Sequence, residues 1–101
     1  MTQAEAGKDG IPVVDNAEAS QFEARVDGHV AFVTYARRGD LIILTHTEVP
    51  KELQGHGLGN VLAHAVLERA RSERLRVVPR CPFIATYIAR HPEYQSLVYE
   101  P

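Results

Sequence analysis

Tryptophan is missing from this 101-residue sequence, and cysteine and methionine occur only once each. A single cysteine cannot form an internal disulfide, which excludes a disulfide-stabilised secreted domain and fits a reducing cytoplasm. No apolar run approaches the length of a membrane span, and no basic segment followed by an apolar one indicates a signal peptide. We therefore expect a cytoplasmic protein that does not bind membranes.

A large excess of positive charge is also absent, because 11 Lys and Arg residues stand against 13 Asp and Glu residues. The net charge of −2 argues against a broad nucleic-acid-binding surface. A local group of arginines has two interpretations, either a solvated helix end that complements the helix dipole or a collar that attracts an anionic cofactor. The group consists of Arg69, Arg71, Arg74, Arg76 and Arg80.

The length and the 45% hydrophobic content predict one small domain with a single core. The first residues are small and polar and include glycine and proline, which predicts a flexible tail over residues 1–14. We expect the compact domain to occupy residues 15–101.

Alternating apolar and polar residues predict an antiparallel β-meander of three strands that ends at Pro50. A long helix follows, because apolar residues recur at one-face spacing from Leu58. A short β-branched strand then indicates a right-handed crossover between parallel strands. A second short helix begins near Pro82, and a final edge strand is expected last. The strands are expected at residues 22–26, 29–36, 41–49, 75–78 and 95–99, and the helices at 58–72 and 82–91.

The run Gln54-Gly55-His56-Gly57-Leu58-Gly59 stands immediately before the long helix. Glycines at alternate positions let a backbone approach a ligand closely. A helix that begins there directs its unpaired N–H groups, and the positive end of its dipole, into the same space. Together these features predict an anion site that suits a phosphate group.

Two familiar phosphate loops do not match this run. A nucleotide P-loop requires Lys and then Ser or Thr after its last glycine, whereas Gly59 is followed by Asn60 and Val61. The dinucleotide fingerprint requires a glycine where Asn60 stands, and it belongs early in a repeated βαβ pattern.

The spacing Gln54-x-x-Gly57-x-Gly59 resembles the pyrophosphate-binding signature of the GNAT superfamily of N-acetyltransferases. It lies where that superfamily keeps it, after the meander and at the start of the long helix. The runs at residues 46–50, 81–87 and 91–94 are similar to a small single-domain (N-acetyltransferase-domain-containing) branch. The resemblance covers about residues 20–98.

The resemblance implies a layered α+β fold, in which the parallel strand pair is splayed into a cleft that holds acetyl-coenzyme A. The pyrophosphate would lie on the amides of residues 55–60, and the pantetheine would lie along residues 47–49. Longer members have two further helices that complete the acceptor pocket, and this chain has no room for them. The implied cofactor-binding residues are Thr47, Val49, Gln54, Gly55, His56, Gly57, Leu58, Gly59, Asn60, Cys81 and Tyr87.

Acetyl transfer to an amine requires a base for the amine proton and stabilisation of the leaving thiolate. His46 and Glu48 stand two residues apart on a predicted strand, so we expect them on one face, with Thr45 and Thr47 on the other. Either could be the base, and the alternative is a structural hydrogen bond. The amide of Val49 is the donor that the family analogy suggests for the thioester carbonyl.

Cys81 has three interpretations: a small apolar filler, a group that lines the channel near the coenzyme sulfur, or a nucleophile that carries a transient acetyl group. Tyr87 and Tyr94 are candidates for the general acid. The histidine spacing matches no metal site, so we expect no metal.

The leading hypothesis is an acetyl-coenzyme A-dependent N-acetyltransferase that transfers directly to an unidentified amine on a small molecule or a protein. One alternative is a non-catalytic acyl-coenzyme A-binding module, and another is a cysteine-dependent acyl carrier. We expect no nucleic-acid or membrane partner, and a monomer or weak homodimer.

Overall fold

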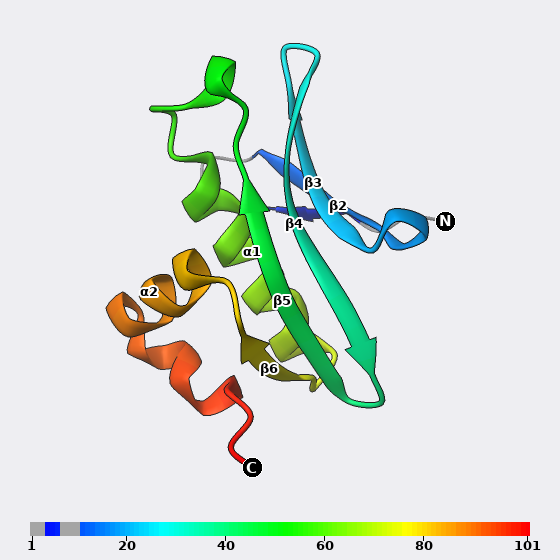
Figure 1. The fold of residues 1–101 in the computed structure, drawn as a ribbon, viewed down its shortest axis with the longest axis vertical. Helices are drawn as coiled ribbons and strands as arrows, with labels where there is room; N and C mark the ends of the chain where they lie inside the picture. Colours follow the sequence, from blue (N-terminus) through cyan, green and yellow to red (C-terminus); the bar gives the residue numbers. More distant parts are fainter. Residues whose placement is uncertain (1–3, 7–10) are drawn as a thin grey trace.

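A computed structural model describes residues 4–6 and 11–101 of the chain. Six strands form one sheet in the order β1-β2-β3-β4-β5-β6, with α1 running behind β5 in Figure 1. The strands are β1 (Ala4–Ala6), β2 (Pro12–Asn16), β3 (Gln21–Val26), β4 (His29–Arg38), β5 (Leu41–Glu48) and β6 (Arg76–Pro79). The helices are α1 (Leu58–Ser72) and α2 (Pro82–Arg90), and short 3-10 segments are η2 (Ala17–Ala19), η3 (Lys51–Leu53) and η4 (Pro92–Leu97).

The predicted α+β fold is confirmed in its main parts. The strands from β1 to β5 pair antiparallel with their neighbours, and β5 pairs parallel with β6 across the α1 crossover. The second short helix, α2, follows β6 directly. A meander, a crossover helix, a parallel pair and a short helix therefore occur in the expected order.

The tail predicted over residues 1–14 is wrong for residues 4–6, which form β1, and for residues 12–14. Residues 12–14 belong to β2, where Val13 is fully buried and Val14 pairs with Glu23 of β3. With β1 the meander has five strands rather than three. Burial of Val13 in the core explains why this segment is ordered. Residues 1–3 and 7–10 of the predicted tail lie outside the described part of the chain.

The final edge strand predicted at residues 95–99 is also wrong. Pro92 begins η4, and the chain meets the sheet only at a single parallel bridge between Val77 and Val98. Buried Tyr94 holds η4 against α1, because its hydroxyl donates a hydrogen bond of 2.6 Å to Glu68. Residues 95–97 therefore belong to a helical turn, and only the end of the predicted strand reaches the sheet, where the Tyr99 amide donates to the Val77 carbonyl at 2.8 Å.

The single core lies between the sheet and α1. The helix buries Leu62 and Val66 completely, and the facing strands bury Val33, Leu44 and Val77 to the same extent. The spacing that predicted the helix is the spacing of this buried face. α1 contacts all six strands, and its N-terminus lies beside the segment that joins it to β5 (Figure 1).

Candidate functional site

A β-bulge interrupts the pairing of β5 with β4. Thr34 pairs with His46 and Tyr35 pairs with Leu44, so Thr45 is an extra residue on β5. A bulge of this kind bends its strand and increases the local twist. It therefore turns the second half of β5 away from the direction set by its first half.

The strands β5 and β6 separate directly at this bulge. Their parallel pairing runs from Leu41 with Arg76 to Leu44 with Pro79 and goes no further. The last connection is a hydrogen bond of 2.9 Å from the Cys81 amide to the Leu44 carbonyl. Within the described chain, residues 45–48 have no strand partner on the β6 side, which makes a fork in the sheet, bounded by residues 45–48 and Cys81.

The bulge also decides which side chains face which way. Thr47 pairs with Val33, a fully buried core residue, whereas His46 pairs with Thr34 on the other face of the sheet. Thr45 was predicted to share the direction of Thr47, and this is wrong, because its hydroxyl lies 2.7 Å from the hydroxyl of Thr34. The extra residue shifts the alternation by one position, so His46 and Glu48 leave the core face.

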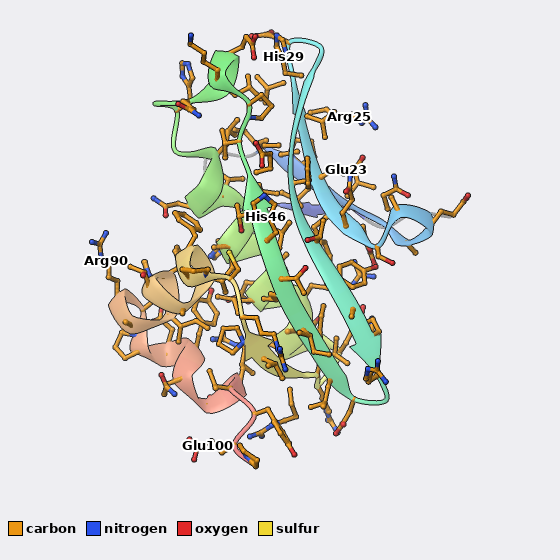
Figure 2. All side chains as sticks on the ribbon, in the orientation of Figure 1. Glu23, Arg25, His29, His46, Arg90 and Glu100 are labelled. Atoms are coloured by element: carbon orange, nitrogen blue, oxygen red, sulfur yellow. The ribbon has the colours of Figure 1, made fainter. Side chains whose placement is uncertain are left out.

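His46 and Glu48 lie on one face, as expected, and form a direct pair. The Nε2 atom of His46 is 2.8 Å from Oε1 of Glu48, and more than half of each side chain is exposed (60% and 53%). Figure 2 labels His46 on β5, on the stretch that follows the bulge. An imidazole and a carboxylate in contact can together accept and pass on a proton.

Thr47 and Cys81 meet on the core side of the fork. The Cys81 sulfur is 3.3 Å from the Thr47 hydroxyl, and Cys81 is almost fully buried as the N-cap residue of α2. The pair is held by β5 on one side and by the start of α2 on the other. The fork thus carries a thiol and a hydroxyl on its core side and the His46–Glu48 pair on its other face.

The glycine run folds as a loop with left-handed backbone. Gly55 has a φ of 87° and Gly57 a φ of 72°, and a Cβ at either position would meet open space. L-residues rarely adopt this conformation, so the two glycines are required for the shape of the loop rather than for space. Between them His56 is exposed, and the Gln54 amide donates to the Val49 carbonyl at 3.3 Å.

The first turn of α1 opens onto the same loop. Gly57 is the N-cap and provides no side-chain hydrogen bond, and no acidic residue lies in the first turn. The amides of Leu58, Gly59 and Asn60 therefore carry the positive end of the helix dipole without a carboxylate from the same turn to neutralise it. This geometry suits an anion, as the sequence predicts.

A pocket of about 230 Å³ lies at this helix end. Of the predicted cofactor-binding residues, Thr47 and Cys81 lie at the fork, and Tyr87 is buried against the rings of His91 and Tyr94. His56 belongs to the loop but does not line the pocket. The pocket is lined by Val49, Leu53, Gln54, Gly55, Gly57, Leu58, Gly59, Asn60 and Phe83.

Sequence reasoning did not assign Leu53 and Phe83 to the site. Phe83 stands one position before Ile84, and Ile84, Tyr87 and Ile88 form the buried stripe of α2. An aromatic residue just outside such a stripe is a signal that the helix has a second apolar contact. Leu53 carries no comparable signal, because η3 is too short to show a period.

The arginine collar is not present at the pocket. Arg69 and Arg71 lie in the last turn of α1 and Arg74 just beyond it, at the opposite end from the glycine loop, and neither Arg76 of β6 nor Arg80 lines the pocket. Arg69 pairs there with Glu73, and Arg71 pairs with Glu68 and lies over the Tyr94 ring. The interpretation as a helix end that complements the dipole fits these positions.

Tyr94 contacts the same pair of residues, Arg71 and Glu68. Burial raises the pKa of its hydroxyl, and the hydrogen bond to Glu68 raises it further. A hydroxyl held in this way stabilises the η4–α1 contact and is a poor proton donor at neutral pH.

The described residues form neither a metal site nor a membrane-spanning helix. No group of three or more His, Cys, Asp or Glu side chains there is arranged to hold a metal ion. Neither described helix has the length and apolar character needed to cross a membrane.

Comparisons with known proteins agree with this geometry. The family described as GCN5-related N-acetyl-transferase matches residues 21–97. Protein NATD1 of Mus musculus is 33% identical over 90 residues, which cover 86% of this chain and 82% of that protein. Protein NATD1 of Homo sapiens is equally similar, with 80% of its length covered. The NMR solution structure of a GCN5-like protein of Staphylococcus aureus matches with a TM-score of 0.64 and 29% identity, over 81% of this chain and 83% of that one.

Proposed function

Because the chain belongs to the GCN5-related N-acetyltransferase family, we propose that it binds acetyl-coenzyme A and transfers the acetyl group to an amine. Family membership supports acetyl transfer in general. The observation that carries the finer proposal is the fork beside Thr45, which lies next to an uncapped helix end and its glycine loop. An extended ligand with a diphosphate at one end and a thioester at the other matches these two features.

In this proposal the diphosphate binds the amides at the start of α1. The left-handed Gly55 and Gly57 shape the loop around it, and Gln54 holds the loop to Val49. The pantetheine continues into the fork, where the unpaired side of residues 45–48 offers backbone groups to its amides, as a strand would. The sulfur then comes to the Thr47–Cys81 end.

In this proposal the His46–Glu48 pair accepts the proton that the amine loses. The neutral amine attacks the thioester carbonyl carbon, a C–N bond forms, and the C–S bond breaks with departure of coenzyme A thiolate, which takes up a proton. The proton lost from the amine goes to the imidazole or carboxylate, which lie 2.8 Å apart on the face away from the core. The Val49 amide is the proposed donor to the carbonyl oxygen as it gains charge.

A second candidate is an acyl carrier that uses Cys81. It is favoured by the contact of 3.3 Å between the Cys81 sulfur and the Thr47 hydroxyl inside the fork. The Cys81 thiolate would attack the same carbonyl carbon and release coenzyme A thiolate, leaving the acetyl group on Cys81. An acetyl mass increment on Cys81 after incubation with acetyl-coenzyme A, absent in Cys81→Ala, would favour this route. Amine acetylation by Cys81→Ala at the wild-type rate would favour direct transfer.

Calorimetric titration with coenzyme A tests the cofactor site. We expect binding that raises the melting temperature, because a ligand at 100 times its Kd stabilises the folded state by about 2.7 kcal/mol. The matched loop variant is Gly57→Ala, which places a side chain on a left-handed backbone and should weaken binding. Absence of heat and of any melting shift in the wild type would contradict the proposal. Binding without thiol release in the presence of amines would favour a non-catalytic module.

A further inference from the structure

The pocket beside α1 has two kinds of wall. One is polar, formed by the loop and first-turn backbone with Gln54 and Asn60. The other is apolar, formed by Val49, Leu53, Leu58 and Phe83. A nucleotide alone would place its polar ribose and phosphates against the apolar wall as well as the polar one. An anion joined to a partly apolar arm would instead place a matching group against each wall.

Phe83 is the least buried part of the apolar wall. It is 41% exposed, and only Tyr99 among the other large hydrophobic residues of the described chain is comparably exposed. Its ring lies against the first turn of α1, because a Cβ built on Gly59 would come within 2.7 Å of the ring carbon Cζ. A ring that contacts the helix end and remains open to solvent has a free apolar side for a ligand.

The position of Phe83 lies between the two ends of the proposed ligand. It stands two residues after Cys81, which borders the fork, and its ring touches Gly59, whose amide belongs to the anion site. A chain that joins a diphosphate on that helix end to a sulfur at Cys81 has to pass this ring. The joining chain in coenzyme A is pantetheine, which carries a dimethyl-substituted carbon near its phosphate end.

We propose that Phe83 is a specificity-determining residue that packs against the pantetheine arm and selects coenzyme A over diphosphate nucleotides that lack the arm. This inference rests on the proposed function, since it assumes that the loop binds the diphosphate. It adds to the proposed function a residue that recognises the apolar segment of the ligand by contact. Gly59 then has a second role, because the absence of its side chain leaves space for the ring.

The test measures two ligands against Phe83→Ala by calorimetry. The first ligand is coenzyme A, and the second is its nucleotide half, adenosine 3′-phosphate 5′-diphosphate. We expect Phe83→Ala to lower the affinity for coenzyme A about tenfold, as for removal of a half-buried aromatic contact, with little change for the nucleotide. Phe83→Leu should recover part of the loss. Tyr99→Ala is the matched control, because Tyr99 is equally exposed (42%) and does not line the pocket.

A double-mutant cycle tests the contact between the ring and Gly59. Gly59→Ala should displace the ring and weaken coenzyme A binding in the wild type, but should add little in the Phe83→Ala background. If the new methyl group blocked the phosphate instead, both ligands would weaken in both backgrounds, and this would contradict the role given to Gly59.

The outcomes separate the two proposals. Equal loss for both ligands in Phe83→Ala, or loss for neither, would overturn the role of Phe83 while wild-type coenzyme A binding still supported the proposed function. Failure of the wild type to bind either ligand would overturn the proposed function itself, and the inference with it.

Discussion

His46 and Glu48 show how one added residue determines which face of a strand carries a chemical group. Their side chains meet at 2.8 Å on the face away from the core because Thr45 bulges from β5. Glu48 is the last residue of β5, and His46 directly follows the bulged residue Thr45. In the proposed transfer, the carboxylate either takes the amine proton itself or orients the imidazole that takes it.

Glu48→Gln keeps the size of the side chain and removes its proton-accepting charge. We expect kcat/KM for acetyl transfer to fall by about 10² or more, the usual contribution of a general base, with coenzyme A affinity unchanged. His46→Ala should reduce the rate as well, and the double variant should lose less than the product of the two effects because the residues act as a unit. Thiol release from acetyl-coenzyme A measures the rate.

Glu93→Gln is the matched control, since Glu93 is exposed on η4 and lies outside the fork. Full activity of Glu48→Gln at saturating amine would show that the pair has only a structural role.

The types of the candidate residues could be predicted from the sequence, but their placement depended on tertiary structure. Strict alternation along β5 would place His46 and Glu48 on the same face as Leu44, which is fully buried. The bulge moves them to the other face, and the sequence Thr45-His46-Thr47 carries no glycine or proline to indicate it. Phe83 was missed for a related reason, because its partner Gly59 is on a different helix.

At the scale of elements, the long ones were predictable and the short ones were not. α1 has a repeated apolar spacing over fifteen residues and a glycine at its N-cap. β2 is short and has one fully buried residue, Val13, so the small and polar residues that precede it in the sequence favoured a tail. η4 was mistaken for a strand because what fixes it is a contact with α1, between Tyr94 and Glu68, that no local pattern reveals.

Tyr94→Phe tests how η4 is held. The change removes the hydroxyl that donates to Glu68 at 2.6 Å and lies 3.2 Å from Nδ1 of His64, while the buried ring remains. We expect the free energy of unfolding to fall by about 1–2 kcal/mol, as for loss of a hydrogen bond to a partly exposed carboxylate. Urea unfolding measures it, with Tyr99→Phe as the control on an exposed ring.

Coenzyme A affinity should stay unchanged in Tyr94→Phe, because Tyr94 does not line the pocket. A large loss of activity with unchanged stability would instead restore Tyr94 as a candidate for the general acid.

The pH dependence of unfolding belongs to the whole molecule, and one buried carboxylate contributes to it. Glu23 on β3, labelled in Figure 2, is only 6% exposed and accepts hydrogen bonds from Asn16, Gln21 and Arg25. Burial acts to raise its pKa, but these donors and the charge of Arg25 outweigh burial and hold the pKa below its ordinary value of 4.5. The folded state therefore favours the ionised form.

Stability from Glu23 is complete above its unfolded pKa and is lost as the pH falls through the lower pKa of the folded state. We expect the wild type to lose stability below about pH 4.5. Glu23→Gln should be less stable by about 1–3 kcal/mol at neutral pH, the cost of losing charged hydrogen bonds, and its stability should change less with acid. Urea unfolding at neutral and acid pH measures both effects.

Glu18→Gln, an exposed change on η2, is the control for this comparison. A Glu23→Gln protein with the same acid slope as the wild type would show that other groups govern acid unfolding.

The fork between β5 and β6 also bears on aggregation. Unpaired strand edges usually lie at the rim of a sheet, where any extended segment of another protein can add to them. Here the free side of residues 45–48 lies inside the sheet, with Cys81 and the start of α2 close at its base. A polypeptide strand, which carries side chains on both faces along its whole length, would meet these walls, whereas a narrower chain without such side chains would not. The backbone hydrogen-bonding groups of residues 45–48 can thus stay available to a small ligand without serving as a template for amyloid-like pairing.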